Sequence, residues 1–271
     1  MNIKERINLI APLSRKEQRE LIATGDVALM KQYLGKKTLS LEFPEATQVA
    51  LVKTGNIKLI MAYRKEFSFC QKAQIEVVRS GNMELIKAFA WFTGEAEGEL
   101  IETCGDMEFL KAYVTKNLLG EEAEMGIVRR GNVELMKTYL KPYSDQFKFR
   151  DDAQVELVKL GNLEMLQAYL SGHGFYEYAQ AEIVKSGRMD FLQAYIKKHR
   201  FYMEPEAELV KTGDIERIKC YYSEYRFYPA AEEELLKLGN EELIEAYEKK
   251  WGVKRNLHVM CFFCPGDDGD L

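Results

Sequence analysis

The sequence is poor in several features that mark common functional classes. Its 271 residues include only three histidines, and it contains no G-x-x-x-x-G-K-[ST], no H-E-x-x-H and no G-x-G-x-x-G after a strand. The five cysteines are odd in number and follow no framework-like spacing, which argues against a disulfide scaffold and favours a reducing compartment. We therefore expect a cytoplasmic protein that is not an enzyme and uses no cofactor or small-molecule substrate.

A strong excess of one charge and a long apolar run are also missing. The 38 basic and 43 acidic residues give a net charge of -5, so no global attraction to nucleic acid or to an anionic membrane is expected. No stretch approaches the ~18 apolar residues of a membrane span, and the N-terminus has no uninterrupted apolar segment. We expect no contact with a membrane, and nucleic-acid binding would need a local basic patch.

What the sequence does contain is an internal repeat. Aligned on a central glycine, nine copies follow one another with steps of 30, 26, 24, 26, 30, 26, 26 and 26 residues. Repeats 1 to 9 are centred on Gly25, Gly55, Gly81, Gly105, Gly131, Gly161, Gly187, Gly213 and Gly239. The pattern predicts one repeat domain over residues 1–251, followed by a capping segment and acidic tail over 252–271.

Each repeat has the pattern of two helices joined at the glycine. An aromatic residue stands eight positions after every glycine, with apolar pairs four and five positions after it, and these offsets share one helical face. Asn or Asp follows the glycine in eight of nine copies, as at a helix N-cap. Apolar pairs three and four positions before the glycine give the first helix its own buried face. We predict an all-α fold, an α-solenoid of about nine stacked helix-turn-helix repeats of ~26 residues.

Repeat 4 fits the pattern only after a shift of one residue. With Cys104 in place of Gly105, Phe92 and Ala96 fall into the columns that hold phenylalanine and alanine in the other first helices. We infer a one-residue insertion at this corner.

The strings V-V-R-S-G-N-M-E-L-I-K-A-F (77–89) and A-E-L-V-K-T-G-D-I-E-R-I-K (207–219) resemble the junction between the two helices of an ankyrin repeat. The similarity covers about half of each unit, and the T-P-L-H opening and about seven residues of the usual 33 are missing. The resemblance implies a protein-interaction scaffold without catalysis. The short units predict helices joined by short loops, without projecting β-hairpin fingers.

A basic residue two positions before the glycine is the main binding candidate. In a solenoid this basic column would form a stripe that faces an acidic protein segment or a phosphate backbone. A glutamate stands three positions earlier in most copies, so the alternative is a solvated face of i,i+3 ion pairs. The basic column consists of Lys53, Arg79, Arg129, Lys159, Lys185, Lys211 and Lys237.

Two other columns have structural interpretations. Gln or Glu stands seven positions before most of the glycines, in the first helical turn, where we expect it to cap free backbone N–H groups. The aromatic column after the glycine, mostly tyrosine, has the phase of a core residue, although stacking on bases is the alternative.

Departures from the repeat are the remaining candidates. Arg217 interrupts an apolar column, either as a functional residue or with its stem packed and its charge in water. The loops 34–44 and 140–149 are four residues longer than the others, and insertions often lie on a binding face. An enzyme would need a polar pocket that breaks the repeat, for which Arg217 and the loop 140–149 are the only indications.

The tail contains H-x2-C-x2-C, formed by His258, Cys261 and Cys264. This is half of a zinc-like spacing, and no second cysteine pair supplies the missing ligand. The preferred interpretation is an apolar strip that covers the last helix pair. For the whole chain we expect a scaffold that binds another protein, and the alternative is a nucleic-acid-binding solenoid that uses the basic column.

Overall fold

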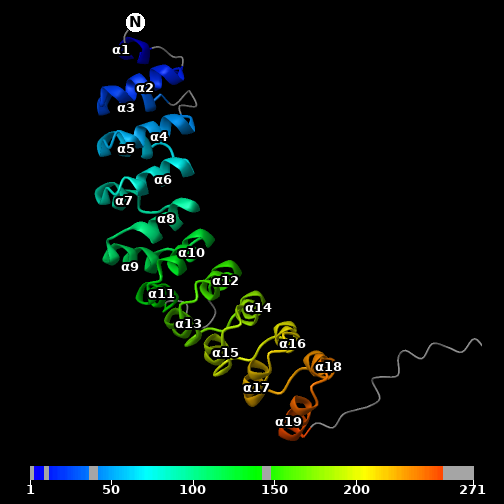
Figure 1. Ribbon diagram of the computed structural model, residues 1–271. Helices are drawn as coiled ribbons and strands as arrows, with labels where there is room; N and C mark the ends of the chain where they lie inside the picture. Colours follow the sequence, from blue (N-terminus) through cyan, green and yellow to red (C-terminus); the bar gives the residue numbers. More distant parts are fainter. Residues whose placement is uncertain (1–2, 9–11, 37–41, 142–147, 253–271) are drawn as a thin grey trace, which may run out of the picture. The chain divides into compact units, whose positions relative to one another are not determined.

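The computed structural model describes residues 3–8, 12–36, 42–141 and 148–252 (Figure 1). Over these residues the chain forms 19 helices and no strand, which confirms the all-α prediction. A short helix α1 (Ile3–Ile7) precedes nine helix pairs. The His258, Cys261 and Cys264 motif, most of the predicted capping segment and the centres of the two longer loops lie outside the described residues.

The first helix of each repeat carries an even number. These helices are α2 (Arg15–Thr24), α4 (Glu45–Lys53), α6 (Gln71–Arg79), α8 (Glu95–Thr103), α10 (Glu121–Arg130), α12 (Asp151–Lys159), α14 (Glu177–Ser186), α16 (Met203–Lys211) and α18 (Pro229–Leu238). The second helices are α3 (Val27–Leu34), α5 (Ile57–Arg64), α7 (Met83–Phe89), α9 (Met107–Lys116), α11 (Val133–Leu140), α13 (Leu163–Leu170), α15 (Met189–Ile196), α17 (Ile215–Glu224) and α19 (Glu241–Trp251).

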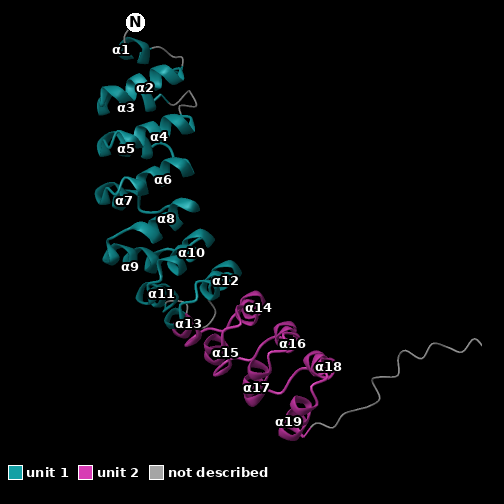
Figure 2. Ribbon diagram, in the orientation of Figure 1, with its two compact units in different colours: residues 1–165 teal, residues 166–271 magenta. Residues whose placement is uncertain are grey.

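The chain divides into two compact units, residues 1–165 and 166–271 (Figure 2). Within unit 1 the first helices pack on one another in sequence, and among the second helices α3 packs on α5 and α9 on α11. Unit 2 has α14, α16 and α18 in one row and α15, α17 and α19 in the other. This is the predicted stacking of helical repeats. The boundary falls inside α13, where no change in the repeat marks it.

The corner between the two helices has the predicted form. Eight of the nine central glycines have φ between 63° and 70°, a left-handed conformation that ends a helix without the strain a side chain would cause. The Asn or Asp that follows accepts the N–H three residues on, as Asn56 does from Leu59 at 3.1 Å. Gly105 is the exception, and there the extended Cys104 ends α8.

The core confirms both the shifted register of repeat 4 and the packing role of the aromatic column. In repeats 1, 2, 4, 8 and 9 the hydroxyl of the column tyrosine accepts the N–H of the residue that leads into the first helix. Tyr63 accepts from Phe43 at 3.0 Å, and in repeat 4 Tyr113 accepts from Phe92 at 3.1 Å. In unit 2 the rings alternate in one continuous series from Tyr169 to Tyr247, with centroids 5.0 to 5.9 Å apart.

The Gln/Glu column has a different role from the predicted one. These side chains are mostly buried, and in most repeats an oxygen of the side chain accepts an N–H from the next repeat rather than from its own helix. Gln48 Nε2 donates to the Phe43 carbonyl at 2.7 Å, while Gln48 Oε1 accepts from the Cys70 N–H at 2.7 Å. Glu97, which the shifted register adds to the column, accepts from the Tyr113 hydroxyl at 3.0 Å and from the Gly120 N–H at 2.9 Å. The column therefore links successive repeats.

Candidate functional site

All seven residues of the basic column are exposed at the C-terminal ends of first helices. The predicted i,i+3 pairs form twice, where Lys211 meets Glu208 and Lys237 meets Glu234, each at 2.8 Å. In these two repeats the column is neutralised within its own helix.

Three other members of the basic column pair with a neighbouring repeat. Lys53 lies 3.6 Å from Glu76, and Arg79 lies 2.7 Å from Glu99. Arg129 lies between two carboxylates, at 3.3 Å from Glu102 and 3.4 Å from Glu156. Lys159 and Lys185 form no ion pair with the part of the chain that the structure describes. The surface around the column is therefore of mixed charge.

Arg217 differs from its predicted structural alternative, in which the charge would reach water. Its side chain is only 3 % exposed. The Nη2 group donates to the carbonyls of Ile183 and Val184, at 3.4 and 2.8 Å, near the end of α14. Burial lowers the pKa of this guanidinium, and the unsatisfied carbonyls of a helix C-terminus favour a cation there. Arg217 thus joins two repeats in unit 2 and lines no open surface.

Unit 2 carries a group of exposed apolar side chains that the sequence analysis did not identify. We call Tyr176, Tyr178, Tyr202 and Met203 the tyrosine edge; they are 41 %, 71 %, 48 % and 47 % exposed. They lie at the starts of α14 and α16, which are neighbours in the first row of helices (Figure 1). The signal that would have found them is a tyrosine eleven positions before the glycine in repeats 7 to 9, outside the phases of the core columns.

The next tyrosine of the same column has a cation on its face. In repeat 9 the Cζ of Arg200 lies 3.6 Å from the ring centroid of Tyr228, and Arg200 also pairs with the buried Glu206 at 3.4 Å. Arg200 stands two positions before the column residue of its own repeat, and its equivalent one repeat earlier is Gly174. Tyr202 therefore has no such cation from the preceding repeat, and its ring is open to solvent.

Two carboxylates accompany the tyrosine edge. Glu177 and Glu204 are exposed at the starts of α14 and α16 and form no ion pair within the described residues. An exposed aromatic surface next to unpaired carboxylates suits a ligand that combines apolar groups with a positive charge.

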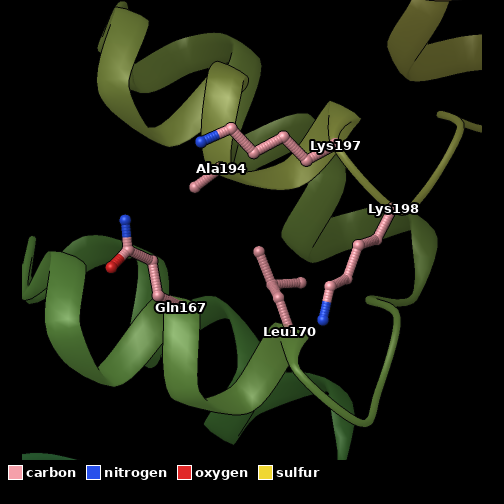
Figure 3. Close-up of a pocket in the computed structure, with 5 residues that line it drawn as sticks. All are labelled: Gln167, Leu170, Ala194, Lys197 and Lys198. Atoms are coloured by element: carbon pink, nitrogen blue, oxygen red, sulfur yellow. The ribbon is translucent and has the colours of Figure 1, made fainter.

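A hollow between α13 and α15 in unit 2 does not form a comparable site. It has a volume of about 300 Å³ and is lined by Gln167, Leu170, Ala194, Lys197 and Lys198. Figure 3 shows that the two lysine side chains extend in different directions, so their ammonium groups do not converge on one point. The hollow also lacks an acid or base that acts together with them.

The described residues give little support for a metal site or a membrane-spanning helix. Within them, no group of three or more His, Cys, Asp or Glu side chains is arranged to hold a metal ion. The same residues include no helix with the length and apolar character needed to cross a bilayer. Comparison of the chain with protein-family models, curated proteins and solved structures finds no match.

Proposed function

We propose that this protein is a non-enzymatic, cytoplasmic scaffold that binds another protein, and that the tyrosine edge of unit 2 is part of its contact surface. The observation that carries this proposal is the exposure of Tyr178, Tyr202 and Met203 on neighbouring helices. Clustered exposed aromatic side chains are typical of protein-binding surfaces, where tyrosine and methionine are enriched. The resemblance to ankyrin repeats points in the same direction.

The surroundings of the edge favour a basic partner segment. Arg200 on the face of Tyr228 is an intramolecular example of the contact that we propose for Tyr202, with a guanidinium of the partner on the ring of Tyr202. Glu177 and Glu204 would attract the same group. The partner is therefore expected to present an arginine or lysine between apolar residues.

Nucleic-acid binding through the basic column is the second candidate. Lys159 and Lys185 favour it because both are exposed and lack an ion pair in the described structure. Five of the seven cations already face a carboxylate, which leaves few of them for phosphate contacts. We therefore rank it below protein binding.

Selection from a displayed library of random peptides tests the first candidate. The full chain should enrich peptides that contain arginine or lysine next to apolar residues. Their binding should fall at least about tenfold in a Tyr178→Ser/Tyr202→Ser variant, because the lost aromatic contacts are the proposed anchors. The backbone N–H of residue 202, which donates to Gln180, is retained in this variant.

A Lys159→Glu/Lys185→Glu/Lys211→Glu variant is the matched control. Peptide binding that survives in the lysine variant and is lost in the tyrosine variant supports the tyrosine edge. Acidic peptides, or peptides whose binding is indifferent to the tyrosine substitutions, would contradict it. Binding of single-stranded or duplex oligonucleotides that falls linearly in log affinity with log salt and disappears in the lysine variant would favour the second candidate.

A further inference from the structure

Unit 1 contains a pocket where the repeat has lost part of a linker. Only two residues, Ala90 and Trp91, separate the aromatic residues Phe89 and Phe92, whereas five separate Tyr195 and Phe201 at the same positions in unit 2. Ala90 closes the short linker with a φ of 61°, and the Trp91 N–H donates to the Phe89 carbonyl at 2.6 Å. This is a γ-turn with positive φ, a backbone conformation that residues with side chains seldom adopt.

The missing linker residues leave space beside Phe89. In several of the longer linkers a ring four residues after the column tyrosine packs on it, as Tyr225 does on Tyr221 with centroids 5.7 Å apart. The short linker offers no such ring to Phe89, because Phe92 already joins the next repeat, and the Arg64 guanidinium lies over the Phe89 ring instead. The resulting Trp91 pocket has a volume of about 290 Å³ and is lined by Arg64, Ser68, Phe69, Gln74, Phe89 and Trp91.

Arg64 gives the Trp91 pocket a positive charge. Its Nη1 donates to the Ala88 carbonyl at 2.7 Å, its Nη2 donates to the Phe89 carbonyl, and its Cζ lies 4.7 Å from the centroid of the Phe89 ring. No carboxylate of the described residues pairs with it. A guanidinium has five N–H donors, so donors remain for a ligand.

The remaining walls supply neutral donors and apolar surface. The Ser68 hydroxyl and the Trp91 indole N–H make no hydrogen bond within the described chain, and Trp91 is 50 % exposed. The rings of Phe69 and Phe89 are buried, and no lining residue is acidic. A cation and two donors beside aromatic rings suit an anion on an apolar group.

We propose that the Trp91 pocket binds a carboxylate carried on a small aromatic or aliphatic group. Arg64 pairs with the carboxylate, and the ring of Trp91 packs against the apolar part. The volume lies just below the roughly 300–1,000 Å³ of small-molecule sites, so one ring or side chain fits and a nucleotide does not. The same chemistry is offered by a free acid and by the C-terminal residue of a peptide. The site lies in unit 1 and does not depend on the tyrosine edge.

The two tryptophans of the chain make the test direct, since 15N-labelled protein gives one indole N–H signal for Trp91 and one for Trp251. Phenylacetate and N-acetylphenylalanine, which mimics a peptide C-terminus, are titrated with phenylacetamide as the uncharged control. The Trp91 signal should move saturably with the acids while the Trp251 signal stays in place. Phenylacetamide should bind at least about tenfold more weakly, because it cannot form the charged hydrogen bonds. Tighter binding of N-acetylphenylalanine identifies a peptide terminus, and tighter binding of phenylacetate identifies a free acid.

Variants assign the effect to Arg64. Arg64→Gln should abolish the shift, and Arg64→Lys, which keeps the charge without the planar fork, should weaken binding. Lys65→Gln removes an adjacent exposed charge and should leave the affinity unchanged. If the Arg64→Gln variant lacks the folded Trp251 signal, it has not folded and the Arg64→Lys variant becomes the test. An unchanged affinity of the Arg64→Lys variant then overturns the proposal. Equal binding of acid and amide, saturation by inorganic phosphate alone, or no shift up to about 10 mM ligand also overturns it.

Discussion

Where unit 1 has Gly98 on α8 and Gly126 on α10, unit 2 has Ala207 on α16 and Glu234 on α18. A Cβ added to Gly98 would lie 2.7 Å from the Glu122 carbonyl oxygen, and one added to Gly126 would lie 2.8 Å from the Gly98 carbonyl oxygen. The backbones of α8 and α10 are therefore in direct contact. In unit 2 the residue at the second position, Glu234, is instead half-buried and pairs with Lys237.

The linkers between repeats also differ between the two units. Unit 1 shortens one linker at Ala90 and Trp91 and opens a pocket, whereas unit 2 keeps full linkers and adds exposed tyrosines at the starts of its first helices. The same repeat pattern is thus modified in two ways. Unit 1 loses linker residues, and unit 2 gains exposed aromatic side chains. Each departure changes a position that the shared core does not require.

The close contact of α8 with α10 predicts the largest effect. Gly126→Val places a branched side chain against backbone that cannot retract without separating the helices, so the free energy of unfolding should fall by about 3 kcal/mol. Urea unfolding followed by circular dichroism measures it. Gly105→Ala is the control, because a Cβ there meets nothing within 4 Å and its φ is not positive. A similar loss in both variants would show that the corner, rather than the helix contact, limits stability.

The link between repeats predicts a second large effect that should be the same in both units. Glu206 accepts from the Tyr221 hydroxyl at 2.7 Å and from the Tyr228 N–H, and Glu124 accepts from the Tyr139 hydroxyl at 3.0 Å and from the Arg150 N–H. Replacement of either by alanine leaves buried donors without acceptors, which should cost about 2–3 kcal/mol. Glu206→Gln, the residue type at Gln180, should cost less than half as much. A loss confined to one unit would contradict the equivalence.

The same glutamate predicts a pH dependence. Burial raises the pKa of Glu206, although the Tyr228 N–H, the Tyr221 hydroxyl and Arg200 act in the opposite direction. The folded protein therefore binds this proton more tightly than the unfolded chain, whose glutamates titrate at about 4.3. Relative to Glu206→Gln, the wild type should be most stable below that pH and lose stability as the pH rises through the folded pKa. Urea midpoints of both proteins between pH 4 and 7 measure the difference, and parallel curves would rule out a raised pKa.

The shortened linker predicts a smaller effect of opposite sign. Ala90→Gly removes the steric cost of a positive φ at a side-chain-bearing residue and should stabilise unit 1 by up to about 1 kcal/mol. Ala88→Gly, two residues earlier within α7, should destabilise by about 1 kcal/mol because glycine lowers helix propensity. Thermal unfolding of the two variants measures both. Destabilisation by Ala90→Gly would show that the γ-turn is not strained.

The repeat made the fold predictable in detail. The glycine, its Asn or Asp neighbour and the tyrosine eight residues on recur in one phase, so nine copies determine the helix faces, and even the register shift at Cys104 was recoverable. The sequence did not predict which side chains reach into the neighbouring repeat. Gln48 was expected to cap its own helix, and it reaches Cys70 of the next repeat, since a single repeat does not show how its neighbour stacks.

The candidate surfaces were less predictable, for two physical reasons. Arg217 was identified because it interrupts a column, but the sequence does not reveal the carbonyls of α14 that receive its guanidinium. Tyr202 and Trp91 were not identified, because aromatic residues are abundant in the core. The phase of Tyr202 in its repeat distinguishes it from the core columns, whereas the exposure of Trp91 is visible in the structure alone. The 24-residue step showed that the linker before Phe92 is short. It did not show that Ala90 takes a positive φ or that a pocket opens beside Phe89.

The smallest predicted effect concerns the basic column, where unit 2 contains both a paired and an unpaired member. Lys211 pairs with Glu208 across an exposed helical turn at 2.8 Å, and Lys185 has no such partner within the described residues. Lys211→Gln should lower the thermal midpoint slightly at low salt, and Lys185→Gln should not change it, because exposed pairs gain little and are screened by ions. Both should match the wild type at high salt. A salt-independent loss in Lys211→Gln would mean that its methylene stem, rather than its charge, contributes to stability.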